Sequence, residues 1–268
     1  MSGLLERFLD RARDAGGRVG AVVVTEDGRE ALSLDAEGTY PAASVIKLPL
    51  VMTLFADAAE GRLPLDQWVF LGERVDGSGV LRDMRDLRRM TLRDLAALAL
   101  TVSDNTATNR LIERVGLERV ATRLEEWGCR RTRLERAMFD MEARSRGREN
   151  VMTPRETASL LLRVVRGARS GDQAMRAVLG LLERNGDRTR LGRYLPDGVT
   201  LAHKDGWLDG VDNDCGVVTA TAPVVVAGFT SGMPALAARP LLGLLGLAAA
   251  KLAGGRIGAL PLELAGGA

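Results

Sequence analysis

Histidine and cysteine are scarce in this sequence of 268 residues, which contains one histidine and two cysteines. A structural zinc site needs four Cys or His ligands, and a catalytic zinc site usually takes three protein ligands. The cysteines, Cys129 and Cys215, lie far apart and form no C-x-x-C pattern, and His203 is alone. The composition therefore predicts a protein without a metal ion, and no motif indicates another cofactor.

Long runs of like residues are also absent. The formal net charge is only +2 and no five like charges follow one another, whereas a nucleic-acid-binding protein is expected to carry a basic stripe. The longest apolar run, residues 241–250, is too short to cross a bilayer. Residues 1–14 mix Leu and Phe with charged residues, so they lack the apolar core of a signal peptide. We expect a cytoplasmic monomer without nucleic-acid partner or membrane span; a secretion signal removed before residue 1 stays an alternative.

Lysine is rare as well. Of 37 basic side chains only three are lysines, namely Lys47, Lys204 and Lys251. Arginine therefore supplies most of the surface charge. Because a buried lysine can lose its proton and an arginine effectively cannot, each lysine is a candidate for chemistry.

The hydrophobic pattern is strand-like near both ends of the chain and helix-like between them. We therefore predict one sheet built from residues 1–59 and 191–268, with an all-helical domain inserted over residues 60–190. Thr91 is expected to cap a helix, and Thr153 to Glu156 has the pattern of a capping box. Strands are predicted over residues 18–25, 31–34, 200–204, 215–221 and 223–230, and terminal helices over residues 4–15 and 234–252.

The motif Ser44-Val45-Ile46-Lys47 opens a predicted helix over residues 44–59. Residues three apart share a helix face, so the serine hydroxyl and the lysine amine can meet. A serine needs an adjacent base to become a good nucleophile, and a desolvated lysine with a lowered pKa can be that base. A helix-capping serine followed by a surface lysine has the same pattern, so this motif alone leaves both interpretations open.

Two further motifs follow along the chain. Ser103-Asp104-Asn105 stands where a predicted helix ends; it either terminates that helix or supplies a second hydroxyl for proton relay and an amide that binds a substrate carbonyl. Lys204-Asp205-Gly206 stands at the end of a predicted strand, either as a turn or where glycine lets a substrate backbone approach closely. Because two of only three lysines fall in these ordered motifs, chance is a poor explanation.

The combination S-x-x-K, S-D-N and K-x-G resembles the signature of class A β-lactamases and penicillin-binding proteins. The resemblance extends over essentially the whole chain, and the segments at residues 77–81 and 134–153 are similar to a branch of β-lactamase-like serine hydrolases. It implies an α/β (α+β) fold: a five-stranded antiparallel sheet flanked by terminal helices, plus an inserted all-helical domain, with Ser44 at the join.

The resemblance also implies roles for individual residues. Ser44 would attack a carbonyl while Lys47 takes its proton, and Ser103 and Lys204 would relay that proton to the leaving group. Asn105 would orient the acyl side chain. The backbone N–H groups of Ser44 and Trp207 would form the oxyanion hole, and Asp205 and Gly206 would adjoin the substrate.

The family's deacylating glutamate is missing from this sequence. Alignment from Leu134-Glu135-Arg136 places Ala137, Met138 or Phe139 at its position, and none of these can act as a base. Asp140 and Glu142 lie nearby and are alternatives, although charged residues in loops are mostly solvated. The sequence thus predicts weak turnover of β-lactams.

The third motif also departs from the family, because Asp205 replaces a Thr or Ser that binds a substrate carboxylate. With Asp209, Asp212 and Asp214, it predicts an acidic rim that disfavours an anionic substrate. His203 cannot face the site together with Lys204, since neighbours on a strand point to opposite faces.

The leading hypothesis is therefore a serine hydrolase that acts on an amide or ester of a small-molecule or peptide-like acyl substrate through an acyl-serine. One alternative is an acyltransferase or a D-alanyl peptidase-like enzyme of the same fold. An alternative of another class is a catalytically silent binding protein. Retention of the serines and lysines of the three motifs favours the enzyme, and loss of the loop glutamate favours acyl transfer or silence.

Overall fold

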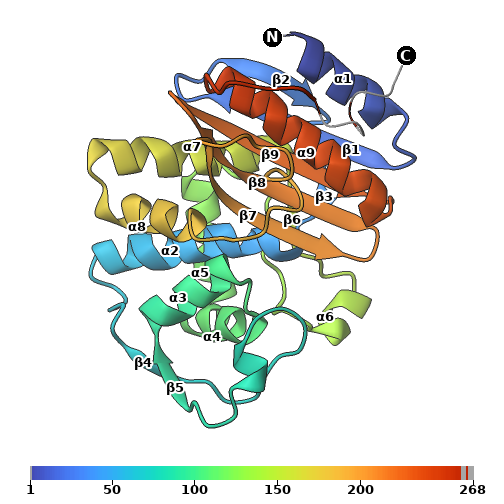
Figure 1. Ribbon diagram of the computed structural model, residues 1–268. Helices are drawn as coiled ribbons and strands as arrows, with labels where there is room; N and C mark the ends of the chain where they lie inside the picture. Colours follow the sequence, from blue (N-terminus) through green and yellow to red (C-terminus); the bar gives the residue numbers. More distant parts are fainter. Residues whose placement is uncertain (1, 261–263, 265–268) are drawn as a thin grey trace.

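A five-stranded antiparallel sheet forms the centre of the computed structural model, which describes residues 2–260 and 264 (Figure 1). Its strand order is β2-β1-β9-β8-β7, and each neighbouring pair is antiparallel. Two strands come from the start of the chain and three from its last third, which confirms the predicted fold class. The strands are β1 (Arg18–Thr25), β2 (Glu30–Leu34), β7 (Thr200–Leu208), β8 (Val211–Thr219) and β9 (Pro223–Ser231).

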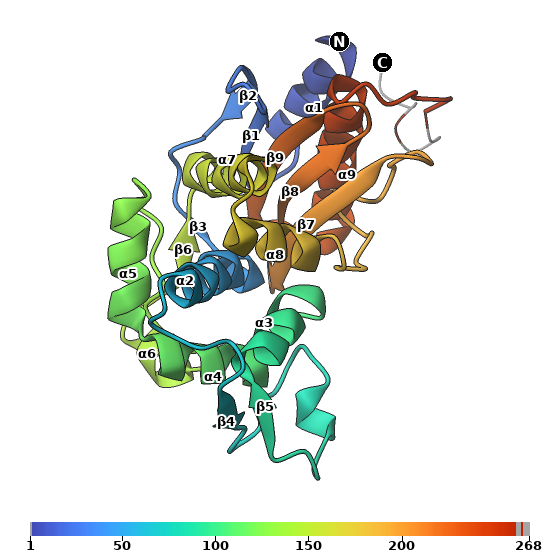
Figure 2. The same ribbon diagram turned by 90° about the vertical axis from the view of Figure 1, so that its left-hand side faces the viewer.

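Helices cover both faces of this sheet. The C-terminal helix α9 (Ala235–Leu252) packs on β8 and β9 with α1 (Ser2–Arg13) beside it, and α7 (Pro154–Ser170) packs on β1 and β9 from the other face (Figure 2). Both faces of β9 are therefore buried, which explains its continuous apolar sequence. By length and composition α9 could cross a membrane, but 61% of it is buried in this fold, as in a core helix.

The second half of the molecule is built around helix α2 (Lys47–Ala59), whose residues from Lys47 to Phe55 are buried. It contacts α3, α4, α5 and α8. The other elements are α3 (Leu92–Thr101), α4 (Asn105–Val115), α5 (Leu117–Glu126), α6 (Met141–Ser145), α8 (Gln173–Leu182), η2 (Leu81–Asp83) and the short strands β3 (Tyr40–Pro41), β4 (Trp68–Phe70), β5 (Arg89–Thr91) and β6 (Val151–Met152).

Both predicted helix caps are present. The Thr91 and Thr153 side chains accept hydrogen bonds from the amides of Asp94 and Glu156. The Glu156 carboxylate, however, accepts from the amides of residues 130–132 instead of closing the predicted capping box. It thereby fixes the chain just before the loop at residues 134–150. The division into a sheet domain and an inserted helical domain stays a prediction, since α7 and α8 also contact the sheet.

Strand β7 is longer than predicted. It continues through Lys204-Asp205-Gly206 to Leu208 and pairs with β8 along its whole length. The third motif therefore lies within a strand and not at its end. An Asp-Gly pair usually interrupts a strand, but here the Asp205 side chain accepts a hydrogen bond from Asn185 and packs in the interior. Tertiary contacts outweigh the local preference.

Candidate active site

Ser44 lies on the 3₁₀ turn η1 (Ala43–Ile46), which leads directly into α2. The preceding residue, Ala43, has φ +47°, a left-handed conformation that is uncommon for a residue with a side chain. Such strain persists only where the surrounding structure imposes it, and it is frequent at functional sites. Here it directs Ser44 into a cavity of about 200 Å³.

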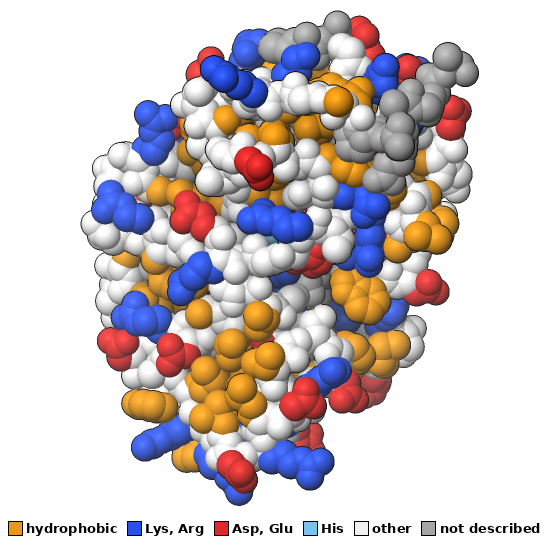
Figure 3. Space-filling model, viewed as in Figure 1, with side chains coloured by type: hydrophobic (Ala, Val, Ile, Leu, Met, Phe, Trp, Pro, Cys, Tyr) orange, Lys and Arg blue, Asp and Glu red, His pale blue; other side chains and the backbone are white. Residues whose placement is uncertain are grey.

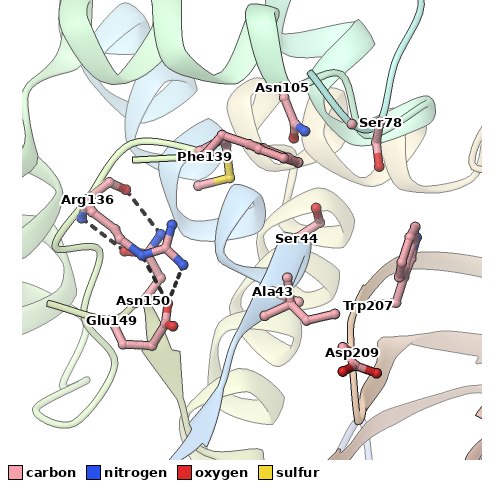
Figure 4. Close-up of a pocket in the computed structure, with 13 residues that line it drawn as sticks. Ala43, Ser44, Ser78, Asn105, Arg136, Phe139, Glu149, Asn150, Trp207 and Asp209 are labelled. Atoms are coloured by element: carbon pink, nitrogen blue, oxygen red, sulfur yellow. Dashed lines mark hydrogen bonds and ion pairs between the residues drawn. The ribbon is translucent and has the colours of Figure 1, made fainter. Parts of the chain in front are cut away.

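This pocket lies between the sheet edge and the helical half. In Figure 4, Ser44 points to its centre, with Trp207 on one side and Phe139 and Asn105 on the other. Phe139 and Trp207 are more than half exposed, at 54% and 57%, so apolar surface flanks the serine. The lining residues are Ala43, Ser44, Gly77, Ser78, Asn105, Arg136, Met138, Phe139, Glu149, Asn150, Trp207, Leu208 and Asp209.

Lys47 is completely buried behind Ser44. Its Nζ donates hydrogen bonds to the Ser103 carbonyl oxygen at 2.6 Å and to Asn105 Oδ1 at 2.8 Å, and it lies 3.1 Å from Ser103 Oγ. Burial and the nearby charge of Lys204 hold the pKa of Lys47 well below its usual range. The first and second motifs therefore meet at one amine.

The partners of this amine also orient its lone pair. A neutral amine has two N–H bonds and one lone pair, and a carbonyl oxygen can only accept. The Ser103 carbonyl and Asn105 Oδ1 therefore take the two N–H groups of neutral Lys47. The remaining position on the nitrogen, where the lone pair of the neutral amine would lie, faces the Ser103 hydroxyl at 3.1 Å. In the part of the chain that the structure describes, Ser44 Oγ makes no hydrogen bond to Lys47, although catalytic hydrogen bonds often tighten only with substrate.

Asn105 makes a second contact from the other end of its amide. Its Nδ2 donates to the Asp76 carbonyl oxygen at 2.8 Å, which leaves one N–H for a substrate. The side chain lines the pocket as predicted from the motif, and its role in orienting an acyl group stays a prediction.

Gly206 brings β7 against the serine turn. A Cβ at Gly206 would lie 2.6 Å from the Ser44 amide nitrogen, so only glycine fits there. The next residue, Trp207, lines the pocket. The main chains of β7 and η1 are therefore adjacent where an oxyanion hole was predicted. Donation by the two amides stays a prediction.

Lys204 is fully buried on β7. Its Nζ donates to the carbonyl oxygen of Asp205 at 2.6 Å and to Asp205 Oδ1 at 3.0 Å. Within the described residues it makes no hydrogen bond to Ser103, so the predicted proton relay between them has no direct link in this structure. Its charge nevertheless acts on Lys47.

The prediction of an acidic rim is wrong for three of its four aspartates. Asp205, Asp212 and Asp214 are buried, do not line the pocket, and are each bonded to a partner. Only Asp209 lines it. The partners are Lys204 and Asn185 for Asp205, Arg190 for Asp212, and His203 with the Leu191 amide for Asp214.

His203 is buried beside Asp214, with 2.8 Å between Nδ1 and Oδ1. It does not line the pocket, as the alternation of strand side chains predicts. Of the neighbouring residues His203 and Lys204, it is Lys204 whose charge acts on Lys47, the lysine of the first motif.

The loop at residues 134–150 carries no carboxylate where the family has its glutamate. Met138 lines the pocket, and its backbone is held by two hydrogen bonds to the Asn109 side chain. The two alternatives, Asp140 and Glu142, lie outside the pocket lining: Asp140 caps α6, and Glu142 pairs with Arg146 at the surface. Neither is placed to activate water at Ser44.

Sequence reasoning missed the ion pair at the base of this loop. Arg136 donates to Glu149 Oε1 at 2.5 Å and 3.1 Å, and both residues line the pocket (Figure 4). Asn150 Oδ1 accepts from the amides of Glu135 and Arg136, which joins the two ends of the loop. Glu149 and Asn150 follow three arginines in the five positions 144–148, so no local signal separated them from ordinary surface residues.

No group of three or more His, Cys, Asp or Glu side chains that could hold a metal ion occurs among the described residues. Basic and acidic side chains are interspersed over the face shown in Figure 3.

The Cys129 and Cys215 thiols are both buried and free, and burial raises their pKa.

Several known proteins are similar to this chain over most of its length. The β-lactamase of Streptomyces albus G is 28% identical over 87% of this chain and 78% of its own length. The crystal structure of a β-lactamase from Sphaerobacter thermophilus is 32% identical, with a TM-score of 0.85 over 94% of this chain and 97% of its own. A variant of PBP-A, solved as an acyl-enzyme complex with penicillin G, is 26% identical with a TM-score of 0.80 over 92% and 96% of the two chains. Residues 4–252 match the model of the Beta-lactamase enzyme family, and the chain belongs to this family of β-lactamase-like serine hydrolases.

Proposed function

We propose that the protein forms an acyl-serine on Ser44 from an amide or ester substrate and hydrolyses that intermediate slowly. The observation that carries this proposal is the environment of Lys47: a buried amine with a lowered pKa, three residues after a serine that lines a pocket with apolar walls. A nucleophile with an adjacent neutral base is the arrangement that acyl transfer needs.

Acylation uses the lone pair described above. Ser44 Oγ attacks the carbonyl carbon while its proton passes to Lys47 Nζ, and the carbonyl oxygen becomes an oxyanion. Backbone donors at Ser44 and Trp207 would stabilise that charge, each by about 3 kcal/mol. Collapse of the tetrahedral intermediate breaks the bond to the leaving group. The leaving group takes the proton from Lys47, directly or through the Ser103 hydroxyl that lies 3.1 Å away.

Deacylation lacks an evident base. Glu149 and Asp209 are the carboxylates among the lining residues. Glu149 accepts hydrogen bonds from the Arg136 guanidinium and from the Asn150 backbone N–H. These bonds hold the carboxylate in place, and the arginine neutralises its charge. Asp209 follows the end of β7 and lies on the Trp207 side of the pocket, away from the loop (Figure 4), and the loop itself presents Met138 to the pocket. Water would therefore be activated poorly, and the acyl-serine should persist.

The pocket surface suggests the kind of acyl group. Met138, Phe139, Trp207 and Leu208 supply apolar area around Ser44, and two of them are aromatic. Such walls bind an apolar or aromatic acyl substituent better than a charged one. The acyl-enzyme of the PBP-A variant with penicillin G supports covalent capture of this kind.

A second candidate function is acyl transfer to an amine or alcohol. The observation that favours it is the same loop, because an acceptor with its own nucleophile needs less activation than water. Hydrolysis and transfer share the first half-reaction and differ in what removes the acyl group.

Intact-mass measurement tests the proposal. The protein is incubated with a fluorophosphonate or with penicillin G, and the adduct is mapped by peptide analysis. We expect one covalent adduct on Ser44 and none in Ser44→Ala. An adduct that persists in Ser44→Ala would assign the nucleophile elsewhere, and no adduct with either reagent would favour a silent binding protein.

A further inference from the structure

We infer that Asp205 determines substrate specificity: its carboxylate fills an anion-binding position made by Lys204, Arg190 and Asn185 behind the pocket wall, so that the enzyme selects substrates with an uncharged leaving group. This inference rests on the proposed acyl-serine function. It adds the chemical class of the substrate, which the geometry of Ser44 and Lys47 leaves open.

Three donors converge on the Asp205 carboxylate. Lys204 Nζ lies 3.0 Å from Oδ1, Asn185 Nδ2 lies 2.9 Å from the same oxygen, and Arg190 Nη1 lies 3.6 Å from Oδ2. Two cations and an amide around one carboxylate form a preformed anion site. In this chain the anion is part of the protein.

Asp205 is the counterion of Lys204. Arg190 pairs with Asp187 at 2.7 Å and Asp212 at 2.5 Å, and Arg239 lies 3.5 Å from Asp212. Among the described residues, Asp205 is the carboxylate that pairs with Lys204. Without its charge, the buried Lys204 would lack this counterion, and a substrate anion could supply it.

The cluster adjoins the reacting serine. Lys204 and Gly206 are two residues apart on β7, so their Cα–Cβ directions share a face of the sheet. Gly206 is the position that contacts the Ser44 amide. A substrate bonded to Ser44 therefore lies beside β7, where the charge of Lys204 is already paired with the carboxylate of Asp205. An anionic group on the leaving side would therefore find the charge of Lys204 already neutralised.

Asp205 stays ionised over the working pH range. Burial alone would raise its pKa, but the Lys204 charge and the hydrogen bond from Asn185 outweigh burial and hold it well below the usual range. The selection against anionic substrates is therefore expected to be the same at all pH values at which the enzyme works.

The test compares two phenylacetyl thioesters that differ only in the leaving group. One leaving thiol is mercaptoacetate, which is anionic, and the other is its methyl ester, which is neutral. Acylation of Ser44 is followed by thiol release and intact mass in wild type, Asp205→Ser and Asp187→Ser. Asp187 is the matched control, because it also pairs with Arg190 but, among the described residues, makes no hydrogen bond or ion pair with Lys204.

We expect wild type to prefer the neutral thioester by at least about ten-fold, a difference of about 1.4 kcal/mol. Asp205→Ser should remove or reverse that preference, and Asp187→Ser should keep it. Equal rates for both probes in wild type, or an equal change of the ratio in both variants, would overturn the inference. If Asp205→Ser fails to fold, Asp205→Asn keeps the side-chain volume and removes the charge.

A binding measurement separates this inference from the proposed function. Sodium acetate is titrated into each protein during thermal unfolding, with sodium chloride as the ionic-strength control. Acetate should raise the Tm of Asp205→Ser in a saturable way and not that of wild type or Asp187→Ser. An unchanged Tm in Asp205→Ser would contradict the anion site. Absence of acylation by both thioesters, with acetate binding intact, would contradict the acyl-serine function alone.

Discussion

Ser103 contacts Lys47 through two of its own atoms, the carbonyl oxygen at 2.6 Å from Nζ and the hydroxyl oxygen at 3.1 Å. Ser103 has φ +57°, a left-handed conformation that few residues with side chains adopt. It lies two residues after the end of α3, where the chain turns toward α4. The strained residue thus lets one side of the chain present both a fixed acceptor and a hydroxyl to the amine.

Removal of the amine should slow acylation strongly without unfolding the protein. In Lys47→Ala, Ser44 keeps its place on η1 but has no base, so the second-order acylation rate constant with a fluorophosphonate should fall by ~10²–10⁴-fold. The matched control is Lys251→Ala, which removes the exposed lysine of α9. Circular dichroism checks folding. Acylation of Lys47→Ala at the wild-type rate would remove this lysine from the mechanism.

Lys204 should set the pH at which acylation begins. Burial, and then the charge of Lys204, lower the pKa of Lys47, and the base must be neutral to accept the Ser44 proton. In Lys204→Met the pKa of Lys47 should rise toward its usual range, so the acidic limb of the acylation profile should move to higher pH.

The measurement is the acylation rate constant from pH 5 to pH 10 in wild type and Lys204→Met. Arg239→Met is the control, because it removes a cation of the same cluster that does not contribute to the lowered pKa of Lys47. A slower variant with an unmoved acidic limb would give Lys204 a role other than this electrostatic one.

Protein stability should report the same titration. The pKa of Lys47 is lowered in the folded state from an ordinary value of 10.5. Between those two pKa values the unfolded chain binds a proton that the folded chain does not, so stability decreases as pH falls from about 10 toward 7. Lys47→Met lacks this loss. The free energy of unfolding of the variant minus that of wild type should therefore increase as pH falls from about 10 toward 7. Urea unfolding at four pH values measures this difference. For the control Lys251→Met the difference from wild type should not change with pH. A difference that does not change with pH for Lys47→Met would mean that the buried amine stays charged.

The sequence allowed prediction of features that depend on local pattern or motif order. Strand β1 has the predicted bounds, because a run of valines between turn residues has one interpretation. The Thr91 and Thr153 caps depend on residues three positions apart. The association of Lys47 with Ser103 could be predicted because the motifs match a known family.

Long-range polar pairing was not predictable in the same way. Asp205 appeared to end a strand and acidify the rim, because its partners Asn185 and Arg190 lie about 15 to 20 positions earlier in the chain. Nothing in the local sequence distinguishes Arg190 from the other arginines, yet it is 1% exposed. Buried ion pairs are selected by tertiary packing, and a single sequence does not show which surface-like residue turns inward.

The loop opposite Ser44 should limit turnover, and a carboxylate at Met138 should release that limit. With penicillin G, wild type is expected to acylate and then accumulate the adduct, because the lining carboxylate of this loop, Glu149, is paired with Arg136 and Met138 is not a base. Asn109 fixes the Met138 backbone from both sides at 2.7 Å and 3.0 Å, so a substitution there keeps the loop in place.

Met138→Glu should therefore raise the deacylation rate by ~10²-fold, the lower range for a positioned general base, while the acylation rate changes little. Met141→Glu is the control: Met141 begins the next helix, is 58% exposed and does not line the pocket. Stopped-flow acylation and the decay of the adduct by intact mass separate the two steps. Fast steady turnover by wild type, with no adduct, would mean that another group activates water, and Glu149 would then be the first residue to substitute. Equal acceleration in both variants would indicate a general effect of negative charge and not a base beside Ser44.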